Sequence, residues 1–382
     1  MTIRCLVSRT LFCALPLPLA LVACATQTPP APIPQPQKPA VTEPAKPATP
    51  PPVSTAEPID QARTEFVRTT AARYAVDPDV IESVLAQAEV RDSIVTAMSR
   101  PAEAKPWSEY RPIFISQARI DGGKAFLAEH RDALAKAEAN TGVPAEIIVA
   151  ILGVETSYGG NMGSYPVVDA LYTLAFAYPR TNEPAKIARE NQREAFFRDE
   201  LAQVFALGKE NGFDITTLKG SYAGAMGWGQ FMPSSYRDFA VDGNGDGKVD
   251  LFNALPDVFA SVANYFVEKG GWQRGGPVVV RARKADGAVA FDPDGLEPRY
   301  TLEQLAARGY TPATPVTGTP KATLFTLDGV DGKEYWIGFN NFHAITRYNN
   351  SRHYAMAVYE LAEAIAGRDP LAARNALGDG GA

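Results

Sequence analysis

Residues 26–58 form a long run of mostly Pro, Ala, Thr and Gln, with almost no large apolar side chains. Such a run cannot bury enough apolar surface to offset the conformational entropy lost on folding, so it is predicted not to fold. Its prolines favour polyproline-like conformations that rise about 3.1 Å per residue, giving a reach of up to roughly 90 Å. The folded part of the chain is therefore expected to begin near Ile59, behind a tether.

The segment before the tether is typical of a secretory signal peptide. Arg4 and Arg9 precede an apolar stretch over residues 11–23, which two prolines interrupt. This stretch is too short and too broken for a good transmembrane helix. It ends in residues 21–24, which resemble the lipobox of bacterial lipoproteins, where the chain is cut before a cysteine that becomes lipid-modified. An ordinary signal peptide with an incidental cysteine is the alternative.

The three cysteines of the chain are Cys5, Cys13 and Cys24. Removal of the signal peptide leaves only Cys24, so an internal disulfide is excluded, while lipidation gives this cysteine a role. Ala25 and Thr26 follow it in place of the aspartate that commonly retains lipoproteins in the inner membrane. We therefore expect a protein that is lipid-anchored at the periplasmic face of the outer membrane.

The chain from residue 59 onward has the apolar patterns of a folded protein. The spacing of apolar residues predicts helices over residues 64–74, 78–89, 124–140, 144–157, 195–208, 256–269, 301–308 and 354–365. Strand patterns cover residues 277–283 and 322–327. The sequence therefore predicts a mainly α protein with a small β-rich insertion, α+β overall. The formal net charge of -6 argues against a general nucleic-acid binder, because no basic excess can neutralise phosphates.

Glu155 lies on the apolar stripe of the helix predicted over residues 144–157. Ile148, Ile151, Leu152 and Glu155 fall at i, i+3, i+4 and i+7. A glutamate there is either paired with a cation or desolvated, and desolvation raises its pKa and keeps it protonated near neutral pH. A protonated carboxyl is what a general acid needs. No convincing second carboxylate is evident, since Glu146 lies on the opposite face and the surroundings of Asp169 say little.

Three blocks, residues 154–160, 221–236 and 340–354, carry a family resemblance. They are similar to the catalytic segment, the substrate-groove segment and the C-terminal groove segment of the membrane-bound lytic murein transglycosylase B family. They stand in that order over about 200 residues, and together they are far more specific than any one alone. The resemblance covers roughly residues 59–368, and the predicted lipobox and tether also fit the family.

The resemblance implies a lysozyme-like core that cuts the MurNAc-GlcNAc β-1,4 bond of peptidoglycan without water as the final nucleophile. It implies that Glu155 first protonates the leaving oxygen and then, as a carboxylate, takes the proton of the muramic acid 6-hydroxyl. That hydroxyl closes a 1,6-anhydro ring, and the substrate's acetamido group stabilises the cation between the two steps. The second carboxylate of ordinary glycosidases is then not needed.

The expected organisation follows from these patterns and the resemblance. It comprises a signal peptide (1–23), the lipidated cysteine and tether (24–58), an N-terminal helical region (59–140), the lysozyme-like catalytic core (141–275), a β-rich insertion (276–327), a return to the core (328–368) and a flexible tail (369–382).

The resemblance also implies a set of substrate-binding residues. These are Ser221, Gln230, Tyr265, Tyr348, Asn349, Tyr354 and Arg193. Core packing is the alternative for each tyrosine. The glycines at positions 224, 227 and 229 are expected to let backbone amides approach a sugar. The family often has adjacent arginines where this chain has Gln192-Arg193, so any grip on the peptide stems rests mainly on Arg193.

An acidic loop over residues 242–248 matches the opening of a calcium-binding loop. Asp242, Asn244 and Asp246 occupy positions 1, 3 and 5, glycine occupies position 6, and Lys248 offers its carbonyl at position 7. Position 12 is an asparagine in place of the usual bidentate glutamate, and the resemblance implies closure by Asp257 instead. We expect a structural Ca²⁺ and no organic cofactor. A solvated turn without an ion is the alternative.

Two other functions are compatible with these motifs: a hydrolytic muramidase and a non-catalytic lipoprotein that binds peptidoglycan. Glu155 separates enzyme from binder, because a pure binder does not need an acid on an apolar stripe. The expected partners are peptidoglycan glycan strands, the membrane through the lipid anchor, and other cell-wall enzymes.

Overall fold

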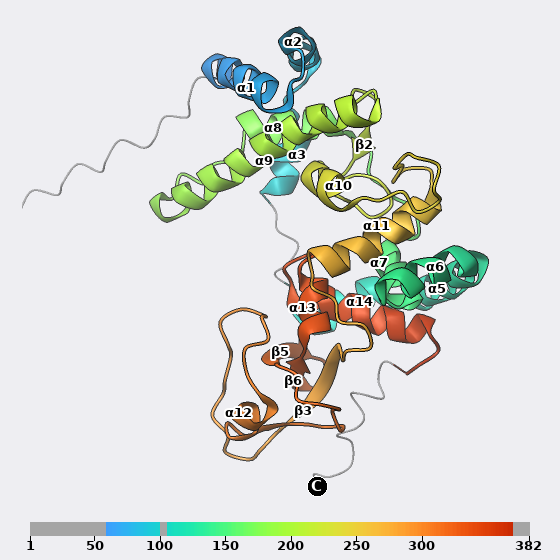
Figure 1. Cartoon of the computed structure of the whole chain (residues 1–382). Helices are drawn as coiled ribbons and strands as arrows, with labels where there is room; N and C mark the ends of the chain where they lie inside the picture. The colour runs from blue at the N-terminus through green and yellow to red at the C-terminus, as the bar shows by residue number, and fades with distance from the viewer. Residues whose placement is uncertain (1–58, 100–104, 370–382) are drawn as a thin grey trace, which may run out of the picture. The chain divides into compact units, whose positions relative to one another are not determined.

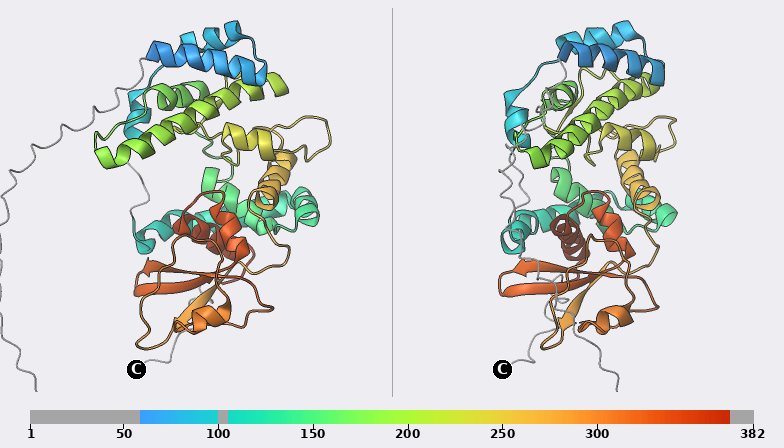
Figure 2. Two further views of the ribbon diagram at one scale, coloured as in Figure 1. Left: turned by 60° about the vertical axis from the view of Figure 1, so that its left-hand side comes forward. Right: turned by 90° about the vertical axis from the view of Figure 1, so that its left-hand side faces the viewer.

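The structure is a computed structural model that describes residues 59–99 and 105–369. The predicted signal peptide, Cys24, the tether and most of the predicted tail lie outside these residues. The described chain contains two groups of helices and one four-stranded sheet with its own helix (Figures 1 and 2).

The upper group in Figure 1 combines helices from two separate parts of the chain. It contains α1 (Ile59–Tyr74), α2 (Pro78–Gln87), α3 (Asp92–Met98), α8 (Val167–Phe176), α9 (Pro184–Asn211) and α10 (Pro233–Phe239). The two-residue strands β1 (Tyr165–Pro166) and β2 (Lys219–Gly220) pair antiparallel beside α8. The sequence predicts α9 only over residues 195–208. Its first half lies outside that range because it has no apolar stripe, and the buried residues lie almost entirely in the second half.

The central group surrounds α7 and also mixes early and late segments. It contains α4 (Trp107–Phe114), α5 (Gln117–Glu129), α6 (Arg131–Thr141), α7 (Ala145–Thr156), α11 (Leu255–Glu268), α13 (Asn340–Thr346) and α14 (Arg352–Ile365). The sequence predicts one helix over residues 124–140, and this prediction is wrong. The chain leaves helical geometry at His130, which ends α5 and precedes α6. The predicted N-terminal region of residues 59–140 thus contributes to both groups of helices.

The sheet has the antiparallel order β4-β3-β6-β5. Its strands are β3 (Val279–Lys284), β4 (Tyr310–Pro312), β5 (Thr323–Gly329) and β6 (Gly332–Gly338), with α12 (Leu302–Ala306) beside them. The sheet extends beyond the predicted end of the insertion at residue 327. A tight turn pairs Gly329 with Gly332, so β6 folds directly back on β5.

The two faces of the sheet belong to different hydrophobic clusters, as the period-2 alternation of a strand requires. Leu324 and Ile337 are buried with α12 in a small cluster of their own. Phe325 and Trp336 face the other way and join the main core, where the Phe325 ring stacks on Phe342 of α13 at 4.5 Å. The insertion therefore braces α13, which leads into the C-terminal groove segment.

Among the described residues, no single helix is long and apolar enough to cross a membrane. Helices α6 and α7 pass that test together, on length and composition only, with a bend of 113° between them.

Candidate active site

Glu155 sits in the last turn of α7, the most buried helix of the central group. Residues 147–153 of this helix are all buried, whereas Glu155 keeps a partly exposed surface. The helix ends immediately afterwards, because Ser157 adopts a left-handed backbone conformation with φ 51°. The apolar helix thus carries one acid to its end, where part of the side chain reaches the surface.

The environment of the Glu155 carboxylate favours its protonated form. Burial raises its pKa from 4.5 to about 7. The hydroxyl of Tyr354, from α14, donates a hydrogen bond of 2.5 Å to Oε1 and works against this shift, because it favours the charged form. Within the described residues, no cation forms an ion pair with Glu155. A carboxyl group with a pKa near 7 can both donate and accept a proton at neutral pH.

The other acids considered as partners of Glu155 are engaged elsewhere. Asp169 pairs with Arg91 at 2.5 Å and accepts the backbone N–H of Glu89. Glu146 pairs with Arg368 at 2.7 Å. Both therefore have structural partners away from Glu155.

The residues after Glu155 lock the catalytic segment to the groove segment, residues 221–236. The Thr156 hydroxyl lies 3.1 Å from the carbonyl oxygen of Trp228 and accepts the N–H of Gly159 at 3.1 Å. Gly159 has φ +82°, and a Cβ added there would lie 2.4 Å from the Trp228 ring. The Tyr158 hydroxyl turns back to donate to the carbonyl of Arg119. The turn after Glu155 is therefore packed under Trp228 in a way that favours glycine at position 159.

The groove segment is folded around its own backbone. Ser221 accepts the N–H groups of Ala223 and Ala225 on its hydroxyl, at 3.3 and 3.1 Å. A Cβ at Gly224 would lie 2.4 Å from Leu171, and one at Gly227 would lie 2.7 Å from the carbonyl oxygen of Leu251. These two glycines make room for protein atoms, which corrects the expectation that they admit a sugar.

Gln230 is held in a left-handed conformation, with φ 51°. Its side-chain amide donates to the carbonyl oxygens of Met162 and Gly227, at 3.1 and 3.0 Å. The Tyr348 hydroxyl donates to the carbonyl of the preceding Gly229 at 2.6 Å. Gln230 and Tyr348 line one cavity, together with Tyr265 and Phe196.

The three tyrosines predicted to bind substrate differ in their surroundings. Tyr354 contacts Glu155 directly. Tyr348 is half-buried and lies close enough to Glu155 for that carboxylate to contribute, after burial, to raising the tyrosine pKa. Tyr265 is buried, and its hydroxyl donates to the carbonyl of Arg347 at 2.7 Å while its ring packs on Tyr348 at 4.9 Å. Tyr265 thus mainly supports Tyr348 by ring packing.

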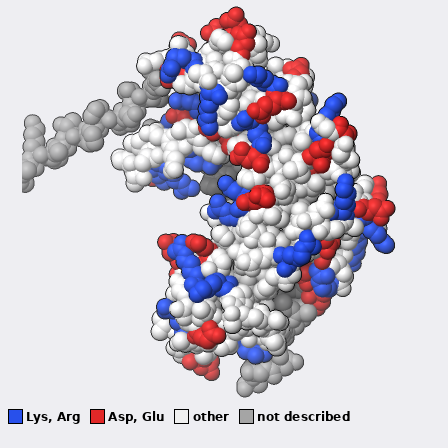
Figure 3. All heavy atoms as spheres, viewed as in Figure 1, with Lys and Arg blue, Asp and Glu red and all other residues white. Residues whose placement is uncertain are grey.

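Within the described chain, no hydrogen bond or ion pair joins the remaining predicted binding residues, Asn349 and Arg193, to Glu155. Asn349 is half-buried, and its backbone carbonyl accepts the N–H of Ser351. Arg193 stands on α9 with its guanidinium over the rings of Phe196 and Phe197, at 5.4 and 4.9 Å. Figure 3 shows one face of the molecule hollowed between its upper and lower parts, with Lys and Arg side chains on both sides of the hollow.

Sequence reasoning missed α4 and its aromatic residues. Tyr110 lies near enough to Tyr354 to contribute to raising its pKa, and its ring packs on His353 at 5.4 Å. Arg119, from α5, donates to the hydroxyl of Ser157 at 3.0 Å. The available signal for α4 was the aromatic spacing of Trp107, Tyr110 and Phe114, which Pro112 inside the helix obscured.

The acidic loop forms a compact turn stabilised by its own side chains. Asp242 accepts the N–H groups of Gly245 and Gly247, at 2.6 and 2.7 Å, and these bonds lower its pKa. Asp246 accepts the N–H of Lys248 at 2.8 Å. Buried Asp257, from α11, accepts the N–H of Gly243 at 2.9 Å and that of Asp250 at 2.9 Å.

The atoms of this loop that are predicted to bind a metal are all oxygens, which suits a hard cation such as Ca²⁺. Within the described residues, however, no three acidic, histidine or cysteine side chains come together as a metal cluster. Asp257 instead closes the loop through backbone N–H groups. Asp257, which the resemblance implies as the closing ligand, contacts the loop as a hydrogen-bond acceptor.

Comparison with known proteins defines the class. The sequence model of a family described as "Transglycosylase SLT domain" matches residues 59–363. The membrane-bound lytic murein transglycosylase B of Escherichia coli (strain K12) is 40% identical over 312 residues, which cover 79% of this chain and 82% of that protein.

Two solved structures agree with this match. Soluble lytic transglycosylase SltB1 from Pseudomonas aeruginosa is 44% identical with a TM-score of 0.70, covering 80% of this chain and 98% of that one. The Escherichia coli lytic transglycosylase Slt35 in complex with calcium is 39% identical with a TM-score of 0.69, covering 80% and 92%. The fold is therefore that of a lytic transglycosylase, lysozyme-like and mainly helical with a small sheet, as predicted. The chain belongs to the transglycosylase SLT family, whose enzymes cleave peptidoglycan.

Proposed function

We propose that Glu155 carries out both proton transfers of a lytic cleavage of the MurNAc-GlcNAc bond. The protonated carboxyl gives its proton to the glycosidic oxygen as the bond from that oxygen to C1 of the muramic acid breaks. The resulting carboxylate then takes the proton of the 6-hydroxyl of the same sugar, whose oxygen bonds to C1. The products are a free 4-hydroxyl on GlcNAc and a 1,6-anhydro-MurNAc end, and Glu155 returns to its protonated form.

The observation that carries this proposal is the raised pKa of a carboxyl group that has only Tyr354 as its hydrogen-bond partner in the described chain. A pKa of about 7 suits a group that must act as acid and then as base. The acetamido group of the substrate supplies the stabilisation that a second carboxylate gives in ordinary glycosidases.

The glycan strand is proposed to lie along residues contributed by α9, the groove segment and the C-terminal groove segment. We assign substrate contacts to Ser221, Gln230, Tyr348, Asn349 and Tyr354, support of the groove wall to Tyr265, and contact with the peptide stems to Arg193. The cavity shared by Gln230 and Tyr348 supports this assignment.

Two further assignments complete the proposal. Asp242, Asn244, Asp246, the Lys248 carbonyl and Asp257 would hold a Ca²⁺ whose role is structural, supported by a relative whose structure contains calcium. Lipidated Cys24 would anchor the protein to the outer membrane on its periplasmic side, supported by a relative named as membrane-bound.

Turnover of purified sacculi by wild type and Glu155→Gln tests the chemistry. Glutamine keeps the size of the side chain but cannot transfer the proton, so turnover is expected to fall to near background while peptidoglycan binding survives. Mass spectrometry of the wild-type products is expected to give muropeptides lighter by one water than muramidase products. Ordinary reducing ends would instead show a hydrolytic muramidase. Full activity of Glu155→Gln would overturn the assignment of Glu155.

A further inference from the structure

A buried carboxylate on α9 holds the groove segment from behind. Glu200 is only 2% exposed. Its two oxygens accept the backbone N–H and the hydroxyl of Ser234, at 2.9 and 2.6 Å. Ser234 lies in the first turn of α10, where backbone N–H groups have no partner within the helix. Glu200 therefore fixes the point at which the groove segment enters α10.

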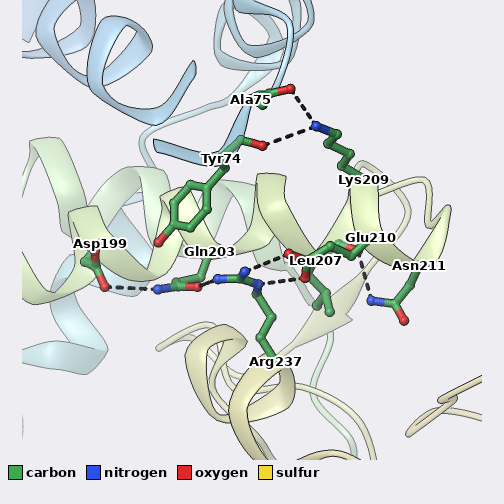
Figure 4. A network of polar contacts seen from close by, with 9 residues as sticks. All are labelled: Tyr74, Ala75, Asp199, Gln203, Leu207, Lys209, Glu210, Asn211 and Arg237. Carbon is green, nitrogen blue, oxygen red and sulfur yellow. Dashed lines mark hydrogen bonds and ion pairs between the residues drawn. The ribbon is translucent and has the colours of Figure 1, made fainter. Parts of the chain in front are cut away.

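The far end of α10 is fastened to the same helix. Arg237 forms two hydrogen bonds to the carboxylate of Glu210, at 2.8 and 2.7 Å, and also contacts Gln203. Figure 4 shows Arg237 reaching from α10 to these α9 side chains, while Lys209 of α9 donates to the backbone of Tyr74 and Ala75. With α10 attached at both ends, the chain just before Ser234 has little freedom to move.

That chain carries Gln230 in a conformation that needs external support. Met226 and Phe231 exchange two backbone hydrogen bonds of 3.0 and 2.9 Å, which close a tight turn around Gln230. The left-handed backbone of Gln230, with φ 51°, is strained for a residue other than glycine and persists only where its surroundings enforce it. Glu200 and Ser234 line the same cavity as Gln230 and Tyr348.

We propose that Glu200 is a positioning residue for the lytic reaction: through Ser234 it holds the turn that presents Gln230 to the glycan strand. Glu200 is not expected to touch substrate, because both of its oxygens are taken by Ser234 and its side chain is buried. The inference rests on the proposed function, in which Gln230 contacts the strand.

The chain offers a closely matched control on the same helix. Glu190 is 7% exposed and accepts the N–H and the hydroxyl of Thr181, at 3.0 and 2.7 Å. Both carboxylates thus accept a backbone N–H and a hydroxyl from one residue, but Thr181 lies in the segment that leads into α9 and not in the groove segment. Glu200 uses one oxygen for each bond, so Glu200→Gln puts an amide N–H against one of the two Ser234 donors and loses about one hydrogen bond. Glu190 accepts both bonds on Oε1, which a glutamine oxygen can replace, so the control is Glu190→Ala, which removes both bonds.

Binding of soluble, uncrosslinked glycan strands is measured in the Glu155→Gln background, where turnover does not interfere. Glu200→Gln is expected to weaken binding about tenfold, as for the loss of one well-placed hydrogen bond. Glu190→Ala is expected to bind within about twofold of the parent, although it loses at least as many hydrogen bonds as Glu200→Gln. In a chain that already carries Gln230→Ala, adding Glu200→Gln is expected to weaken glycan binding by less than about twofold, because the effect of Glu200 passes through Gln230.

Equal binding by the Glu200→Gln and Glu190→Ala variants, or full additivity with Gln230→Ala, overturns the positioning role. If Glu200→Gln does not fold, Ser234→Ala removes the hydroxyl bond from the other side, and unchanged binding by that variant also overturns it. Failure of the proposed function is seen separately, as retained turnover of Glu155→Gln in an otherwise wild-type chain.

Discussion

The hydroxyl of Tyr354 donates a hydrogen bond of 2.5 Å to Oε1 of Glu155, across 199 positions of sequence. The bond joins the start of α14 to the end of α7, two helices that pack against each other along their lengths. The Ser351 side chain orients the start of α14, because it accepts the backbone N–H of Tyr354 at 3.3 Å. Burial raises the pKa of Glu155 and this single donor limits the rise.

Removing that donor is expected to shift the pH dependence of the enzyme. Because the Tyr354 hydroxyl lowers the pKa of Glu155, Tyr354→Phe raises it, and the acid stays protonated to higher pH. The alkaline limb of kcat/KM, which reports loss of the proton from the free enzyme, should therefore move to higher pH. Tyr359→Phe on the same helix is the control and should leave the limb in place. A shift to lower pH in Tyr354→Phe would contradict the arrangement.

The raised pKa of Glu155 also predicts a stability difference with a definite pH dependence. Between the unfolded pKa of 4.5 and the folded value of about 7, the native state binds more protons, so this group makes stability fall as pH rises. Glu155→Gln removes the penalty and should stabilise the fold at pH 8 by about 1–3 kcal/mol, discounted for partial exposure. Calorimetry should show the gain disappearing towards pH 4. An equal gain at both pH values would show that the carboxyl is not desolvated.

The desolvated position of Glu155 was predictable from sequence, because helical periodicity is local and Glu155 interrupts an otherwise apolar stripe. From the sequence, Tyr354 is predicted only as a residue that binds the sugar. The role as hydrogen-bond donor depends on how α14 packs on α7, which periodicity does not encode. The groove glycines were misassigned for the same reason, since Leu171 and the Leu251 carbonyl approach Gly224 and Gly227 only in the folded chain.

Glu200 shows where sequence reasoning ends. Its hydrogen bonds reach Ser234, 34 residues away, and nothing in the sequence pattern of α9 distinguishes it from the other acids of that helix. The same limit explains Asp257, which family resemblance associates with the acidic loop while the structure shows it accepting backbone N–H groups. Buried polar contacts between distant segments are set by tertiary packing.

Calcium is expected to raise the melting temperature of the wild type, because a ligand that binds only the folded state stabilises it by mass action. At a free concentration of 100 times Kd the gain is about 2.7 kcal/mol. Asp246→Ala should abolish the response, since it removes a carboxylate ligand. Asp214→Ala is the control, because Asp214 makes a similar exposed turn outside the loop. Identical melting curves with chelator and with excess calcium would reduce the loop to a hydrogen-bonded turn.

Anchoring is predicted to depend on Cys24. Cys24→Ser should release the protein from the membrane fraction into the soluble periplasm, because no other membrane-binding feature is evident in the tether sequence. Fractionation followed by detergent partitioning measures this, with Cys13→Ser as the control inside the predicted signal peptide. Unchanged partitioning of Cys24→Ser would contradict lipidation at this position.

Gly159 is predicted to be irreplaceable, because the turn after Glu155 is packed beneath Trp228. An alanine there would combine a left-handed φ of +82° with a Cβ only 2.4 Å from the Trp228 ring. Strain and overpacking together should destabilise the fold by about 2–4 kcal/mol. Activity should fall further than the loss of stability accounts for, because Thr156 bonds the Trp228 carbonyl and lies next to Glu155.

Gly160→Ala is the matched control: its φ is not left-handed and its Cβ would be no nearer than 3.2 Å to any atom. Urea unfolding and turnover of sacculi compare the two variants. Equal stability and activity would show that the indole can move aside, so that the contact does not position the acid.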